Sequence, residues 1–232
     1  MNAIKQETRV KTETDVTFTN FVYLPDGYDA SGDIARPAIL FLHGKDETGK
    51  TFDILPDGGL HSFVDKNDLP FVIFEPQCPA ESEWVFQLDA LKTYLDKMVK
   101  QYGIDTNRIY LTGLSMGAIG AWHLAIRFPS AFAAIVPISG GTYPFLGYPD
   151  AVTRIKDVPV WAFHGEDDDV LPVALTRILV DTLIKSDGNV KYTYYENTGH
   201  DAWTRTYSSM DIYHWLLRQE KTTNEKRKRA NA

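Results

Sequence analysis

Residues 113–117 read Gly-Leu-Ser-Met-Gly, and no other segment constrains the fold of this chain as strongly. The apolar run 108–112 before it is typical of a buried strand, and the run 118–128 after it is typical of a helix. A chain that passes from strand to helix at a serine needs a sharp turn, and glycines two positions before and after leave room for it. Such a turn lifts the Ser115 hydroxyl clear of the sheet beside the amino end of a helix, where an oxyanion is stabilised. The pattern therefore predicts a nucleophilic serine.

Apolar segments along the rest of the chain alternate between strand and helix patterns. Several strand candidates are continuous runs of Val, Ile, Leu and Phe, as expected for parallel strands buried on both faces. The predicted strands are 18–24, 38–42, 71–75, 108–112, 133–138, 160–164 and 190–196, and the predicted helices are 84–102, 115–128, 172–185 and 203–218. This alternation predicts an α/β fold with a mostly parallel sheet and helices on both faces. The first strand is expected to pair antiparallel at an edge.

The chain has 232 residues, a usual size for a single α/β domain with a large core. We therefore predict one catalytic domain over residues 1–220. Residues 221–232 are rich in Lys and Arg and contain almost no apolar side chains. A disordered tail is expected there, with a basic targeting patch as the alternative.

The net charge of −7 gives no electrostatic reason to expect a nucleic-acid partner. No apolar run approaches the ~20 residues of a membrane span, so no membrane partner is expected either. The first residues lack the apolar core of a secretion signal, and the single cysteine, Cys78, rules out an internal disulfide. We expect a cytoplasmic protein, or a secreted one if a signal peptide has been removed. The sequence gives no indication of the oligomeric state.

A serine hydroxyl becomes a good nucleophile when a histidine takes its proton and a carboxylate orients that histidine. Among the six histidines, His43 and His164 end predicted strands before a glycine and are expected to shape turns. His200 follows the last predicted strand on a glycine-containing loop and precedes the last helix. This is the place where the strand–serine–helix arrangement needs its base, so His200 is the predicted base.

The acid is expected after the strand at 160–164, where four acidic residues follow one another. A run of charge is usually a solvated loop, but one carboxylate must turn inward to reach the histidine. Asp168 fits this position best, with Asp167 and Asp169 as alternatives.

Two backbone N–H groups are needed to stabilise an oxyanion. One is expected from Met116, directly after the serine. The other is expected from Lys45, in the loop 43–49 that follows the strand at 38–42, where Gly44 permits a tight turn. No cluster with metal-ligand spacing accompanies these groups, so we expect neither a metal nor a cofactor.

These motifs resemble those of the α/β-hydrolases. Within that superfamily the chain is similar to small serine carboxylesterases of the dienelactone-hydrolase-like, polyhydroxybutyrate-depolymerase-like and feruloyl-esterase-like groups. The similarity extends over about residues 18–218, and its segments are 23–28, 41–44, 102–110, 113–117, 127–129, 164–168 and 199–200. The resemblance supports Ser115, Asp168 and His200 as a catalytic triad. The chain departs from the family pattern at Ala118, where a second glycine is frequent, and at residues 45–46, where a small residue and a glycine are frequent.

The segment 139–157, where such hydrolases often carry a lid, is too short to build a cap domain. Tyr143, Phe145 and Tyr148 in this segment are candidates for lining an acyl or aromatic pocket, although they could equally pack the loop down. Trp84 and Trp203 flank the expected cleft, with the same two alternatives. Short acyl chains are expected, because an open cleft has little wall to bind longer ones.

The resemblance implies a serine carboxylesterase that acts on small-molecule esters through an acyl-enzyme on Ser115. A feruloyl or acetyl-xylan esterase acting on plant polysaccharide esters is an alternative of the same class. A peptidase and a non-catalytic binding protein with a hydrolase fold are alternatives of other classes. The complete set of serine, acid and histidine argues against the binding protein, which has no need for all three.

Overall fold

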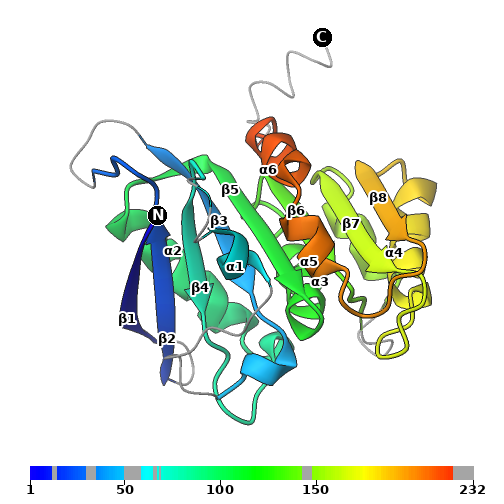
Figure 1. Ribbon diagram of the computed structural model, residues 1–232, viewed down its shortest axis with the longest axis horizontal. Coiled ribbons are helices and arrows are strands. Elements are labelled where there is room, and N and C mark those ends of the chain that lie inside the picture. The colour runs from blue at the N-terminus through cyan, green and yellow to red at the C-terminus, as the bar shows by residue number, and fades with distance from the viewer. Residues whose placement is uncertain are drawn as a thin grey trace.

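The computed structural model describes residues 1–11, 15–29, 35–49, 59–64, 67, 69–142 and 148–221. The strands in these ranges are β1 (Asn2–Lys11), β2 (Asp15–Leu24), β3 (Arg36–Leu42), β4 (Val72–Pro76), β5 (Ile104–Leu114), β6 (Ala134–Ile138), β7 (Val160–Gly165) and β8 (Val190–Tyr195). They form one sheet in the order β1-β2-β4-β3-β5-β6-β7-β8 (Figure 1). Strands β3 to β8 are parallel, whereas β2 pairs antiparallel with β1 and β4.

Helices cover both faces of this sheet (Figure 1). They are α1 (Leu60–Val64), α2 (Leu88–Gln101), α3 (Met116–Arg127), α4 (Ala174–Lys185), α5 (Trp203–Tyr207) and α6 (Met210–Leu217), with 3-10 helices η1 (Lys45–Glu47), η2 (Trp84–Phe86) and η3 (Asp150–Ile155). Helices α2, α3 and α4 pack on one face, and α1, α5 and α6 pack on the other. In β3, Ala38 and Leu40 belong to the core of the first face, whereas Ile39 and Phe41 belong to the core of the second. This arrangement confirms the predicted α/β fold.

The sequence did not indicate β1, which pairs with β2 along its whole length. Only Thr8 and Val10 of this strand are buried, and the charged residues among its exposed positions conceal any apolar alternation. Because β1 covers the edge, the strand predicted at 18–24 is not an edge strand. It lies within β2, between β1 and β4, and the prediction of an edge position was wrong.

Two predicted helices are shorter than their apolar patterns suggest. The segment 203–218 is divided into α5 and α6, because Ser209 has an extended backbone and its side chain accepts the Asp211 N–H to begin the second helix. In the segment 84–102 the α-helix begins at Leu88, after the separate turn of η2.

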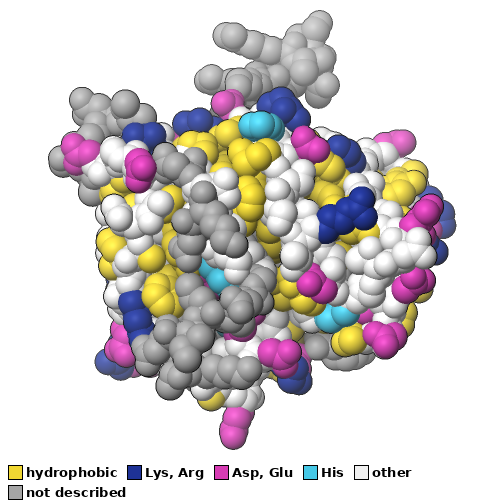
Figure 2. Space-filling view, in the orientation of Figure 1, with side chains coloured by type: hydrophobic (Ala, Val, Ile, Leu, Met, Phe, Trp, Pro, Cys, Tyr) yellow, Lys and Arg dark blue, Asp and Glu magenta, His cyan; other side chains and the backbone are white. Residues whose placement is uncertain are grey.

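The predicted basic tail lies outside the described residues except for Lys221, whose N–H donates to the Asn107 carbonyl at 3.0 Å. Acidic and basic side chains are mixed around the rim of the face in Figure 2. None of the helices in the described ranges is long and apolar enough to cross a bilayer. The expectation of no nucleic-acid and no membrane partner stays a prediction.

Candidate active site

Ser115 joins the end of β5 to the start of α3 with a positive φ of 53° and a ψ of −121°. A residue other than glycine in such a conformation carries about 1–3 kcal/mol of strain. A Cβ atom on Gly117 would lie 1.9 Å from the Leu42 carbonyl oxygen, and one on Gly113 would lie 2.4 Å from the Gly117 carbonyl oxygen. Neither position accepts a side chain, so both glycines are needed for the sharp turn between the strand and the helix.

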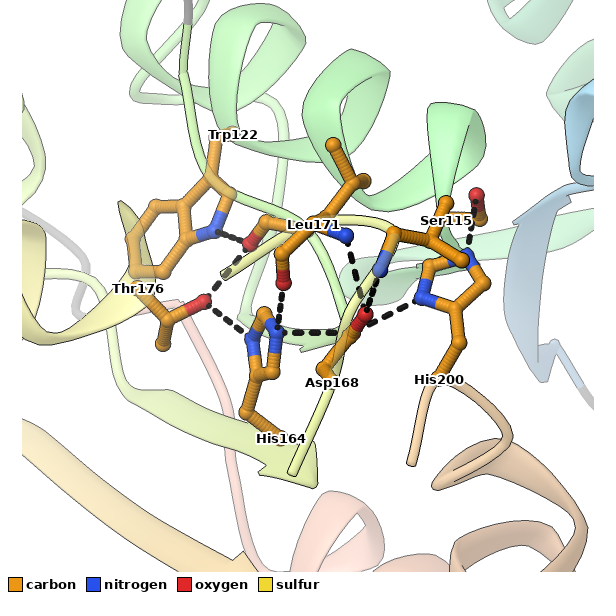
Figure 3. Close-up of polar contacts among 9 residues, drawn as sticks. Ser115, Trp122, His164, Asp168, Leu171, Thr176 and His200 are labelled. Carbon is orange, nitrogen blue, oxygen red and sulfur yellow. Dashed lines mark hydrogen bonds and ion pairs between the residues drawn. The ribbon is translucent and has the colours of Figure 1, made fainter. Parts of the chain in front are cut away.

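Loops at the carboxyl ends of the parallel strands bring Ser115, Asp168 and His200 together (Figure 3). His200 Nε2 lies 2.9 Å from Ser115 Oγ, and His200 Nδ1 lies 2.7 Å from Asp168 Oδ2. Asp168 follows β7, and His200 lies between β8 and α5. The alternatives Asp167 and Asp169 are exposed, whereas Asp168 is buried. The three residues predicted from sequence therefore lie in one hydrogen-bonded chain, with Asp168 in the acid position.

The Asp168 carboxylate is held by several donors. Its Oδ1 accepts the backbone N–H groups of Val170 at 2.9 Å and Leu171 at 2.8 Å, and its Oδ2 accepts from His200. Burial opposes ionisation, but the hydrogen bonds from His200 and from these backbone groups outweigh it, so the pKa of Asp168 lies below its usual range. The acid is therefore charged at neutral pH.

The charge on Asp168 fixes the tautomer of His200. An ionised carboxylate only accepts hydrogen bonds, so His200 Nδ1 carries the proton that points to it. In the neutral ring Nε2 is then an acceptor, and it faces the Ser115 hydroxyl. The arrangement can thus remove a proton from Ser115 Oγ and hold the resulting imidazolium beside a fixed negative charge.

The two predicted oxyanion donors each begin a helix next to Ser115. Met116 is the first residue of α3, and Lys45 is the first residue of η1. A Cβ atom on Gly44 would lie 3.7 Å from Ser115 Cβ, so the loop that carries Lys45 passes beside the serine. The first N–H groups of a helix have no partner within the helix and favour a nearby negative charge.

Buried contacts of His43 and Trp84 anchor the loop before Lys45. His43 Nε2 accepts the Cys78 N–H at 2.9 Å, and Trp84 Nε1 donates to the His43 carbonyl at 2.9 Å. Burial lowers the pKa of His43 to about 4, so the ring is neutral. Of the two alternatives left open for Trp84, the structure favours packing over a pocket position, because this side chain is completely buried and packs against Gly120 of α3.

Glu47, the last residue of η1, is an ionisable group on the same loop. Burial, together with the nearby charge of Glu75, raises the pKa of Glu47 to about 8. At neutral pH this carboxyl is therefore mostly protonated.

The other pocket candidates have different outcomes. Trp203, at the start of α5, is partly exposed, and its ring meets the His200 ring edge to face at 5.0 Å. Tyr143 and Phe145 lie outside the described residues, whereas Tyr148 is partly buried and packs against the core, with its hydroxyl 3.1 Å from His123 Nδ1. Within the described ranges, no group of three or more His, Cys, Asp and Glu side chains could hold a metal ion.

His164 also contacts the site, and this contact was not predicted from the sequence. It is the second-to-last residue of β7, its side chain is completely buried, and its Nε2 lies 3.0 Å from Asp168 Oδ2 (Figure 3). A histidine four residues before the acid, at the end of a strand, was the one signal in the sequence for this contact.

Similar proteins include esterases. A bifunctional acetylxylan esterase/xylanase from Neocallimastix patriciarum is 30% identical over 142 residues, which are 58% of this chain and 20% of that protein. The chain thus spans a fifth of the length of this curated relative. The crystal structure of a thermostable esterase has 33% sequence identity and a TM-score of 0.78, and the match covers 94% of this chain and 63% of that one.

A feruloyl esterase module from Clostridium thermocellum, complexed with sinapinate, has a TM-score of 0.70, and the match covers 93% of this chain and 86% of that one. At 17% identity this likeness supports the fold alone. The family model described as phospholipase/carboxylesterase matches residues 80–216, which are more than half of the chain and include the loops of Ser115, Asp168 and His200. The chain therefore belongs to the phospholipase/carboxylesterase family of α/β-hydrolases.

Proposed function

We propose that this chain is a serine carboxylesterase that hydrolyses small soluble esters through an acyl-enzyme on Ser115. The observation that carries the proposal is the hydrogen-bonded chain from Ser115 through His200 to Asp168, which begins at a strained turn. Membership of the phospholipase/carboxylesterase family supports ester bonds as the bonds that are cleaved. A non-catalytic binding protein would have no use for a strained serine aligned with a base, so we disfavour that alternative.

In the acylation step, Ser115 Oγ attacks the ester carbonyl while His200 Nε2 takes the hydroxyl proton. The carbonyl oxygen becomes an oxyanion, and the backbone N–H groups of Met116 and Lys45 are the proposed donors to it. The tetrahedral intermediate then expels the alcohol, which receives the proton from His200. The products are a free alcohol and an acyl group bound to Ser115.

In the deacylation step, water attacks the acyl carbonyl while His200 Nε2 takes a proton from it. The second tetrahedral intermediate collapses, Ser115 Oγ leaves and regains the proton, and the carboxylic acid departs. Asp168 holds the same tautomer of His200 throughout, because its carboxylate accepts the Nδ1 proton in both steps. No metal or cofactor takes part in these steps.

An acetyl-xylan or feruloyl esterase is the more specific candidate within this class. The curated relative that is named as an acetylxylan esterase/xylanase favours an acetyl group on a polysaccharide. The partly exposed Trp203 ring beside His200 would offer an aromatic surface to either a sugar or a feruloyl group.

The test measures hydrolysis of aryl esters of rising acyl length, acetylated xylan, methyl ferulate and a peptide amide by the wild type and by Ser115→Ala. We expect turnover of the short esters by the wild type, none by the variant, and no cleavage of the amide. Mass spectrometry after treatment with a fluorophosphonate should find the label on Ser115. Unchanged ester turnover by Ser115→Ala would overturn the mechanism, and amide cleavage in preference to esters would favour the peptidase.

A further inference from the structure

The ring of His164 connects the acid of the site to the rest of the fold. Its Nε2 lies 3.0 Å from Asp168 Oδ2 and 2.8 Å from the Leu171 carbonyl oxygen, and its Nδ1 lies 2.8 Å from Thr176 Oγ1. The side chains of His164 and Asp168 are both completely buried. Figure 3 shows the ring on the opposite side of the Asp168 carboxylate from His200.

The partners of His164 determine its proton positions. The Leu171 carbonyl and the ionised Asp168 carboxylate only accept hydrogen bonds, so Nε2 carries a proton and donates it toward them. Burial holds the pKa of His164 below its usual value, which favours the neutral ring, and Nδ1 faces the oxygen of the Thr176 hydroxyl. Asp168 Oδ2 therefore faces two donors, Nδ1 of His200 and Nε2 of His164.

The network continues from His164 to the helix that carries the serine. Thr176 Oγ1 of α4 also lies 2.8 Å from the Gly140 carbonyl oxygen, and that oxygen accepts the indole N–H of Trp122 on α3 at 3.2 Å. Gly140 packs directly against the turn of the serine, because a Cβ atom on it would lie 2.6 Å from the Ser115 carbonyl oxygen. The polar chain thus runs from Asp168 to the immediate neighbourhood of Ser115 without passing through His200.

We propose that His164 is a positioning residue for the esterase reaction: it donates a second hydrogen bond to Oδ2 of Asp168 and, through its contacts with Thr176 and Gly140, fixes the carboxylate relative to the helix that carries Ser115. This inference rests on the function proposed above. Its effect is to keep Oδ2 aligned with His200, since displacement of a catalytic group by about 1 Å costs as much as 100-fold in rate. Among the described residues, the titratable groups that act on His164 are Asp168 and His200, while α4 and α3 contribute the uncharged Thr176 and Trp122.

The test compares His164→Leu with His164→Gln, whose amide N–H can take the place of the Nε2 proton. We expect His164→Leu to lower kcat roughly 10- to 100-fold, which corresponds to the loss of one hydrogen bond to a charged group, with KM changed by less than ~3-fold. We expect His164→Gln to recover most of this loss. Without the His164 proton the carboxylate attracts the imidazolium more strongly, so the pH at which kcat/KM reaches half of its plateau should rise by ~0.5–1 in the Leu variant.

A matched control is His123→Leu, because His123 is also buried but bonds to Tyr148, 3.1 Å from its Nδ1. We expect this control to lower the thermal midpoint without shifting the half-plateau pH. If His164→Leu does not fold, Thr176→Val replaces it in the test. This variant removes the hydroxyl that contacts His164 Nδ1 but leaves the Nε2 donor, and it should lower kcat by ~2- to 10-fold.

Wild-type kcat and an unshifted pH profile in a folded His164→Leu or Thr176→Val variant would overturn this inference, whatever the change in thermal midpoint. Failure of the proposed function has a different signature, which is ester turnover by Ser115→Ala. An inactive Ser115→Ala beside a fully active His164→Leu would leave the serine mechanism intact and remove only the role of His164.

Discussion

On the acid side of the site, formed by the loops after β7 and β8, the structure keeps a carboxylate charged. On the oxyanion side, formed by the loop after β3, it keeps the ionisable side chains of His43 and Glu47 neutral. Hydrogen bonds lower the pKa of Asp168, whereas burial lowers the pKa of His43 to about 4 and raises that of Glu47 to about 8. The difference follows the charges of the proposed reaction, because a positive imidazolium forms beside Asp168 and a negative oxyanion forms beside the loop of Lys45. A charged Glu47 would oppose that oxyanion.

The largest effect is expected where the two sides meet, at Ser115. Ser115→Ala should lower kcat by roughly 10⁴- to 10⁶-fold, because serine, base and acid act as one unit. The measurement is hydrolysis of a short-chain aryl ester at substrate saturation, with circular dichroism to show that the fold is retained. Fluorophosphonate labelling of the wild type, followed by peptide mapping, identifies the nucleophile independently of whether the Ser115→Ala variant folds. A label found on any residue other than Ser115 would contradict the assignment.

The next largest effect isolates the acid side. Asp168→Asn should lower kcat by about 10⁴-fold, because an amide can donate to Nδ1 and stabilise the wrong tautomer of His200. Asp167→Asn and Asp169→Asn are matched controls in the same loop. Both side chains are exposed, so each should change kcat by less than ~3-fold. If Asp167→Asn or Asp169→Asn proves to be the crippling change, the acid has been assigned to the wrong residue.

A smaller effect, on stability, isolates the oxyanion side. The folded-state pKa of Glu47 is about 8, above the usual 4.5, so the folded state binds the proton more tightly than the unfolded chain does. Its contribution to the free energy of unfolding is complete below pH 4.5 and is lost as the pH rises to 8. Glu47→Gln removes this dependence.

The measurement for Glu47→Gln is the urea midpoint at pH 5, 7 and 9. The stability of the variant relative to wild type should increase steadily across this series. Glu196→Gln, at an exposed position, is the control and should show no such trend. A constant difference between wild type and Glu47→Gln would mean that this side does not depend on a protonated carboxyl.

The smallest effect concerns substrate contact beside the base. Trp203→Ala should raise KM for aromatic esters by about 2- to 10-fold, the value of one aromatic contact, and should change KM for acetyl esters of small alcohols less. Trp215→Ala is a suitable control, because that ring packs against Trp161. Equal KM values for Trp203→Ala and wild type on both substrates would remove Trp203 from the proposed pocket.

The fold class and the three residues of the proposed triad could be predicted because each depends on local pattern. Continuous apolar runs mark the parallel strands, and Ser115, Asp168 and His200 each follow such a run on a short loop. β1 could not be predicted in this way, because its mostly polar residues show no apolar pattern and form a strand by pairing with β2. The role of Trp84 stayed open between two alternatives, and the contact of His164 with Asp168 was missed, for a related reason. Their roles depend on Gly120, His43 and Thr176, which lie elsewhere in the chain.

Because Ser115 has a positive φ, the residue that provides the nucleophile also lowers the stability of the fold. Glycine adopts this conformation without the strain that serine or alanine carries there, and the relief exceeds the ~0.5–1 kcal/mol that glycine loses through greater freedom of the unfolded chain. The inactive Ser115→Gly should therefore melt at a higher temperature than either the wild type or Ser115→Ala. A screen for heat resistance alone would enrich the inactive Ser115→Gly variant. Variants in directed evolution therefore need to be selected for ester turnover from the first round.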